Sequence, residues 1–102
     1  MDIYKNSQHF PREETYGLRA QLRRAAVSTA ANIVEGSARR GEAEYLNFLN
    51  VAVGSASETR YLLDVSRRLG FMKSKDAEEL DPRCGQLIGG LVQLIASIRN
   101  RP

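Results

Sequence analysis

The chain has 102 residues, the length of one domain, so we treat residues 1–102 as a single domain. Hydrophobic residues make up 42% and charged residues 26%, which excludes a disordered chain, and no apolar run approaches the roughly 20 residues of a membrane span. The net charge of +3 is mild, but 12 of the 15 cations are arginine, the side chain best suited to forked contacts with carboxylates or phosphates.

The single cysteine and the single histidine limit the chemistry that the chain can support. Cys84 has no partner for an internal disulfide, which is typical of a reducing compartment, and the N-terminus lacks the regions of a signal peptide. We therefore expect a cytoplasmic protein. Cys84 and His9 are also too few for a metal site, so we expect neither metal nor cofactor.

Helical patterns dominate the first half of the chain. Residues 1–9 predict a short helical piece that ends before Pro11, because the residue preceding a proline disfavours helix. A long helix is predicted from about Leu18 toward Ala38, with Gly41 as the residue that ends it. Its buried face and a second apolar stripe beside it follow the spacing of a helix. The buried face comprises Leu22, Ala25, Thr29 and Ile33. The second stripe comprises Val27, Ala31, Val34 and Ala38.

Two further helices are predicted in the second half. The first runs from Glu42 to Leu69, where Gly70 stops it, and its apolar residues spread around its first half, which argues for a subunit interface. The last opens at Ser74 as its N-cap, and Pro82 is expected to kink or restart it. The predicted fold class is all-α, an up-and-down helical bundle.

One polar stripe runs through the small residues of the first long helix, at Arg24, Ser28, Asn32, Glu35 and Arg39. The small residues beside it let other helices approach closely, where a carboxylate must find donors or take up a proton. Arg39, one turn on, Asn32 and an arginine of another helix are candidate donors for Glu35. We interpret Glu35 and Glu58 as partners of Arg23, Arg24 and Asn32 between helices or subunits. General acid–base chemistry by these glutamates is the alternative, but no nucleophile or metal ligand accompanies them, so we expect no enzyme.

Several motifs in this order resemble a known family. They are "FPREETYGL" at 10–18, "QLRRAAVS" at 21–28, "ANIVEG" at 31–36, "YLNFLNVAVGSASE" at 45–58 and "LGF" at 69–71. With these motifs the chain resembles the four-helix-bundle proteins encoded in 23S ribosomal RNA intervening sequences. The resemblance covers essentially the whole chain.

The resemblance implies a four-helix bundle with a shortened first helix that assembles into a ring-like homopentamer. The family's first helix extends upstream of Ile3–Lys5, and many relatives have proline where Ala30 stands. The accessory variability proteins of diversity-generating retroelements are related in fold. They resemble this family as positively charged, barrel-shaped pentamers, and they bind nucleic acid and a reverse transcriptase. The resemblance carries over no catalytic residues.

Two functions remain open at this point. The first is a non-enzymatic oligomeric adaptor that binds RNA or DNA through the backbone, with strong salt dependence and no sequence preference. The second is a structural protein-interaction oligomer without nucleic-acid binding, in which arginines pair with acids of adjacent subunits. The candidate nucleic-acid-binding residues are Arg19, Arg23, Arg39, Arg40, Arg67 and Arg68, with Lys73 and Lys75 nearby.

Overall fold

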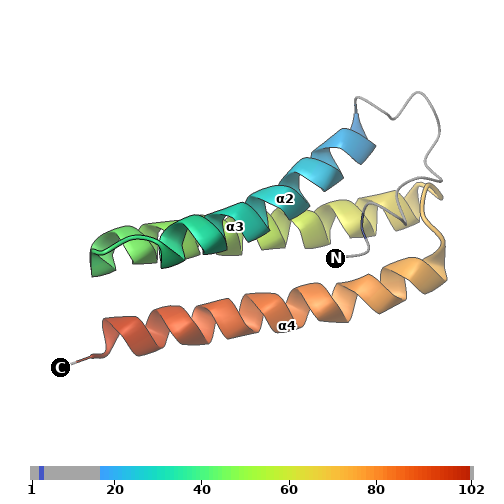
Figure 1. Cartoon of the computed structure of the whole chain (residues 1–102). Coiled ribbons are helices and arrows are strands. Elements are labelled where there is room, and N and C mark those ends of the chain that lie inside the picture. The colour runs from blue at the N-terminus through green and yellow to red at the C-terminus, as the bar shows by residue number, and fades with distance from the viewer. Residues whose placement is uncertain (1–2, 4–16, 102) are drawn as a thin grey trace.

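The computed structural model describes residue 3 and residues 17–101, and this part of the chain forms three helices and no strand. Helix α2 spans Leu18–Ser37, α3 spans Glu42–Arg68 and α4 spans Ser74–Arg99. Each helix runs antiparallel to the one before it, and α3 packs against both α2 and α4 (Figure 1). The prediction of an all-helical fold is therefore confirmed for the described residues.

The prediction of a four-helix bundle is wrong, because the described part of the chain has three helices. The fourth helix was expected from the pattern in residues 1–9, of which the structure describes only Ile3. The other residues of that pattern lie outside the described part of the chain. The three long helices instead share their apolar faces with one another and with the buried side chain of Ile3.

The end of α3 is fixed by Gly70, as its sequence position predicted. Gly70 has a φ of 76°, in the left-handed region that favours glycine. The amide of Phe71 donates to the carbonyl of Ser66 at 2.9 Å, and the amide of Gly70 donates to the carbonyl of Arg67 at 3.0 Å. These two bonds form a Schellman motif, which satisfies carbonyls that the helix end would otherwise leave without donors.

Two predictions about helix ends were wrong. Gly41 does not end α2 but precedes α3 as its N-cap, with an extended backbone, because Ala38 already closes α2 by donating to Glu35. α4 begins at Ser74, as predicted, but its N-cap is Lys73 and not Ser74 itself. The helix also continues through Pro82 without a restart. Pro82 is exposed, and it removes one backbone donor from the helix.

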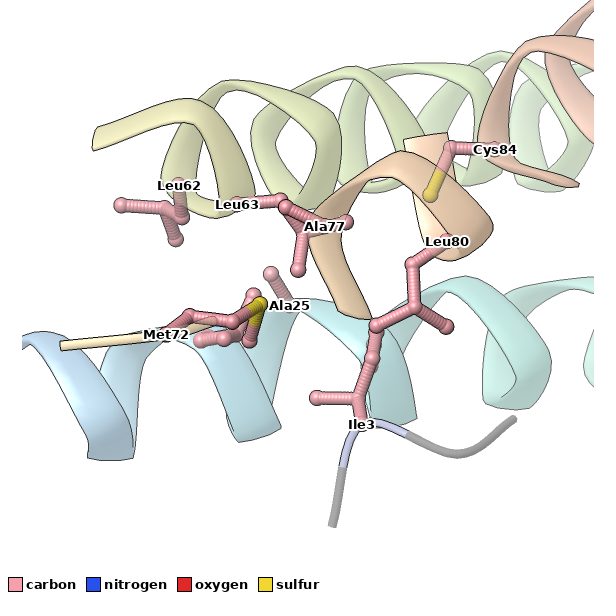
Figure 2. Packing of buried hydrophobic residues seen from close by; sticks show 10 residues of the cluster. Ile3, Ala25, Leu62, Leu63, Met72, Ala77, Leu80 and Cys84 are labelled. Atoms are coloured by element: carbon pink, nitrogen blue, oxygen red, sulfur yellow. The ribbon is translucent and has the colours of Figure 1, made fainter. Parts of the chain in front are cut away.

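The hydrophobic core consists of two clusters along the helices. One joins the first half of α2 to the second half of α3 and the first half of α4, and includes Ala25, Leu63 and Leu80 (Figure 2). The other joins the first half of α3 to the second half of α4 through Leu49 and Leu91, with Ile33 partly buried against it. The predicted buried face of α2 is thus confirmed, and the core fixes which helix ends lie together.

Polar groups inside this core are satisfied within their own helices. The hydroxyls of Thr29, Thr59 and Ser66 donate to the carbonyls of Ala25, Ser55 and Leu62 at 2.9, 2.8 and 2.7 Å. Each bond spans one helical turn, so these buried hydroxyls need no partner from another helix. The back-bonding expected of Thr29 is therefore confirmed.

Candidate nucleic-acid interface

The small residues of α2 allow a close approach of α3. Gly36 is buried, and a β-carbon at this position would lie 2.8 Å from Cβ of Phe48 and 3.1 Å from Cδ1 of Tyr45. Cβ of Phe48 is fixed to the backbone and cannot move aside as a flexible side chain can. Glycine at position 36 is therefore required for the contact between the end of α2 and the beginning of α3.

A hydrogen bond from the polar stripe of α2 links this helix to α3. The hydroxyls of Ser28 and Ser55 are 2.9 Å apart, which joins α2 to α3. The amide of Asn32 donates to the carbonyl of Ser28 at 2.7 Å and to its hydroxyl at 3.1 Å. Asn32 therefore orients the serine that bridges the two helices.

Glu35 finds its donor one turn along its own helix. Nη2 of Arg39 lies 3.2 Å from Oε2 of Glu35, and the guanidinium carbon of Arg39 lies 5.0 Å from the centre of the Phe48 ring. Both side chains of the ion pair are well exposed, so the pair contributes little to stability. Arg24 and Glu58 are exposed, and neither has an ion-pair partner among the described residues.

The structure divides the predicted nucleic-acid-binding residues into two groups. α2 and α3 are antiparallel, so the beginning of α2 lies beside the end of α3, as the first core cluster shows. About 20 residues of helix, or 30 Å, separate that end from the other. Arg19, Arg23, Arg67 and Arg68 lie at the first end, whereas Arg39 and Arg40 lie at the other (Figure 1).

Among the residues that the structure describes, the first end is the more basic of the two, and we call it the basic end. Its cations outnumber its carboxylates, whereas the two are nearly balanced at the other end. The basic end carries Arg19, Arg23, Arg24, Arg67, Arg68, Lys73 and Lys75 against Asp64, Asp76, Glu78 and Glu79. The other end carries Arg39, Arg40, Arg99 and Arg101 against Glu35, Glu42 and Glu44.

Asp64 holds two of the cations at the basic end. Nη2 of Arg67 and Nε of Arg68 each lie 2.9 Å from a carboxylate oxygen of Asp64. The hydrogen bond from Arg67, together with the charges of both arginines, holds the pKa of Asp64 below its usual range. One carboxylate thus orients two adjacent arginines, and the three groups together keep a positive charge.

Arg60 and Asp81 form an ion pair that no pattern in the sequence predicted. Nε of Arg60 donates to Oδ1 of Asp81 at 2.7 Å and Nη2 donates to Oδ2 at 3.0 Å, which joins α3 to α4. Gly85 makes room for this pair, because a β-carbon there would lie 3.2 Å from Nη1 of Arg60. The glycine one turn after Asp81 was the available signal.

Other features of the described residues bear on the class of protein. No group of His, Cys, Asp or Glu within the described ranges could hold a metal ion. Cys84 is buried, and the loss of hydration raises the pKa of its thiol. Within residue 3 and residues 17–101, no helix combines the length and the apolar character that a membrane crossing requires.

Comparison with known proteins identifies the family. A solved structure of a protein of unknown function from the S23 ribosomal protein family of Bacteroides thetaiotaomicron is 23% identical, with a TM-score of 0.84 over 91% of this chain and 87% of that one. This similarity establishes a shared fold. No curated protein matches the chain. The model of the 23S rRNA-intervening sequence protein family matches residues 1–93, so the chain belongs to this family.

Proposed function

We propose that the protein is a non-enzymatic, self-associating helical adaptor that binds the phosphate backbone of RNA or DNA. The observation that carries this proposal is the excess of cations at the basic end. Helices α2 and α3 supply most of them side by side, and Lys73 and Lys75 follow at the start of α4. Phosphate groups along a nucleic-acid strand are the ligands that such a surface attracts.

The arrangement favours backbone contacts over base readout. The arginines of the basic end sit on two antiparallel helices that pack against each other, so neither helix projects alone as a recognition helix would. Contacts to phosphate position a protein on a nucleic acid without selecting a sequence. We therefore expect similar affinity for different sequences and a steep loss of affinity with salt.

The ion pairs at Asp64 are compatible with phosphate binding. Arg67 and Arg68 are exposed, and exposed ion pairs are weak in water. A phosphate can therefore replace Asp64 as a partner at small cost, or bind to the donors that Asp64 leaves unused. Asp64 meanwhile keeps two adjacent guanidinium groups oriented before a nucleic acid arrives.

Self-association is the second part of the proposal. Several large apolar side chains are exposed on the described helices, including Val27, Val34 and Tyr61, and such surfaces are typical of interfaces. A ring of copies would repeat the basic end and multiply its field beyond the mild +3 charge of one chain. The resemblance to the pentameric accessory variability proteins supports the same arrangement, with nucleic acid as partner.

The alternative is a protein-interaction oligomer that binds no nucleic acid. The observation in its favour is that Arg39, Arg67 and Arg68 already contact carboxylates of their own helices. In that case the arginines pair with carboxylates of their own and of adjacent subunits, and the partner is a protein.

A titration distinguishes the two functions. Labelled single- and double-stranded RNA and DNA of mixed sequence are titrated with the purified protein at about 50 and 200 mM salt, and binding is followed by fluorescence anisotropy. The proposal predicts binding at the lower salt that weakens by a factor of ten or more at the higher salt, because condensed counterions are released on binding. An absence of binding at the lower salt would leave only the protein-interaction oligomer.

A further inference from the structure

Tyr61 differs from the other aromatic residues that the structure describes, because it alone is exposed. Tyr61 on α3 is 67% exposed, whereas Tyr45, Phe48 and Phe71 are partly buried. An aromatic ring in water forgoes the large apolar burial that it gains against another surface. The ring of Tyr61 is therefore available to a flat apolar group from outside the chain.

Tyr61 borders a hollow between α3 and α4. The hollow has a volume of about 790 Å³, and its lining includes the buried side chains of Leu63 and Ala77 together with Pro82 and Ile88. Sites that bind small organic groups are typically concave and mainly apolar, with a few polar groups at defined places. The hollow thus offers apolar contacts to a flat group that lies against Tyr61.

The charged groups in the lining suit a neutral occupant better than a phosphate. Nε of Arg60 lies 2.7 Å from Oδ1 of Asp81, so these opposite charges cancel. Arg67 and Asp64 cancel in the same way, with Nη2 at 2.9 Å from Oδ1. Glu78 also lines the hollow, is exposed and has no ion-pair partner among the described residues. The lining therefore carries a net negative charge, which repels an anion but not a neutral nucleobase.

The cations of the basic end lie just beyond the hollow on both helices. Arg68 follows Tyr61 by seven positions, which is two turns or about 10 Å along the same face of α3. On α4, Lys75 precedes Glu78 by three positions, or about one turn. Arg68 and Lys75 are exposed. A strand whose phosphates contact these cations therefore passes close to the ring of Tyr61.

We infer that Tyr61 is a stacking platform for an unpaired base of a single-stranded nucleic acid whose phosphates bind to the basic end. Every base has a flat face, so stacking adds affinity without selecting a sequence. The bases of a duplex are stacked on one another, whereas those of a single strand can turn outward onto an aromatic side chain. The inference rests on the phosphate binding proposed above and adds to it a preference for single strands.

This role separates Tyr61 from the exposed aliphatic residues of the fold. Val27 and Val34 lie on α2 and have no aromatic face on which a base could stack. They stay available for the self-association proposed above while Tyr61 contacts a base.

The first test separates stacking from phosphate contacts by their salt dependence. A labelled single-stranded RNA of mixed sequence is titrated with the wild type, Tyr61→Ala and Tyr61→Phe over a range of salt, and binding is followed by anisotropy. Loss of the ring is expected to weaken binding by about 5- to 150-fold at each salt concentration. The slope of log affinity against log salt is expected to stay unchanged, because no phosphate contact is removed.

Tyr61→Phe and Leu69→Ala are the matched controls of this titration. Tyr61→Phe keeps the aromatic face, and Leu69→Ala removes an exposed apolar side chain at the same end of α3. Both are expected to bind like the wild type. A loss of less than fivefold for Tyr61→Ala, or an equal loss for Tyr61→Phe, would overturn the inference and leave phosphate binding intact. If the wild type binds no nucleic acid at low salt, phosphate binding fails as well, so the two failures are distinguishable.

The second test compares strands and checks the assembly. Tyr61→Ala is expected to bind a double-stranded RNA of the same length as the wild type does, because the duplex offers no unpaired base within it. The same loss for the duplex and the single strand would contradict stacking. Light scattering and circular dichroism of Tyr61→Ala are expected to give the mass and the helicity of the wild type. A change in either would place Tyr61 in a subunit interface or in the core and would overturn the inference.

Discussion

Arg60 and Asp81 join α3 to α4 through two parallel hydrogen bonds, 2.7 Å from Nε to Oδ1 and 3.0 Å from Nη2 to Oδ2. This forked geometry is specific to a guanidinium and a carboxylate. The hydrogen bond from Arg60 is the main cause that lowers the pKa of Asp81 from its ordinary value of 3.8, and the charge of Arg60 adds to it. Gly85, one turn further along α4, leaves space for the guanidinium.

The stability that this pair contributes depends on pH. Since the pKa of Asp81 is lower in the folded protein, its contribution is present above the unfolded value and is lost as the pH falls through the folded value. Asp81→Asn is therefore expected to lower the free energy of unfolding at pH 7, and its difference from the wild type should shrink below about pH 4. Urea unfolding at several pH values measures this, with Glu58→Gln as the control. A difference that grows toward low pH would contradict the assignment.

Gly36 is expected to tolerate no larger side chain. Gly36→Ala should destabilise the fold by about 1–3 kcal/mol, because the new methyl group overlaps Cβ of Phe48, and this cost exceeds the gain in helix propensity. Gly90→Ala is the matched control. No atom lies within 4 Å of its added β-carbon, so this substitution should stabilise α4 by up to about 1 kcal/mol. Thermal unfolding of both variants compares them, and equal effects would show that α2 and α3 are not in close contact at Gly36.

Leu63, on α3, is buried in the first core cluster, which joins α3 to α2 and α4 (Figure 2). Leu63→Ala should cost about 2–5 kcal/mol, because it removes buried apolar surface and leaves a cavity. Leu69→Ala removes the same atoms at an exposed position and should change stability by no more than about 0.5 kcal/mol. Chemical denaturation measures both, and similar costs for the two variants would place Leu63 outside the core.

Cys84 should react slowly with thiol reagents in the folded protein. Its side chain is buried in the first core cluster, and desolvation raises the pKa of the thiol, so little thiolate forms near neutral pH. A colorimetric disulfide reagent at pH 7 is expected to label Cys84 at least tenfold faster in denaturant than in buffer. Equal rates in the two solutions would mean that the first half of α4 does not protect the thiol.

Local patterns in the sequence predicted much of the fold. The starts of α2 and α3, the left-handed Gly70 and the back-bonding of Thr29 each depend on residues within one or two turns. The wrong predictions concern which residue caps or ends a helix. Gly41 precedes α3 and Ser74 begins α4, each within a few residues of another candidate cap, so composition alone does not decide which residue caps which helix.

The candidate site was less predictable, because it depends on which helix ends meet. Arg39 and Arg68 look equivalent in sequence, since each belongs to an arginine pair near the end of a helix. Antiparallel packing places these two ends at opposite sides of the fold. The partner of Arg60 was missed for a related reason, since Asp81 lies 21 positions away and no periodicity within one helix connects them.

The most direct test of the account compares arginines at the two ends of the fold. Arg67→Ala with Arg68→Ala removes two cations from the basic end, and Arg39→Ala with Arg40→Ala removes two from the other end. Anisotropy titrations of a labelled RNA over a range of salt give the slope of log affinity against log salt for each variant and the wild type. The account predicts a slope smaller by about two for the first variant, since each lost phosphate contact removes about one, and no change for the second. Equal slopes for all three proteins, or a loss confined to the second variant, would contradict it.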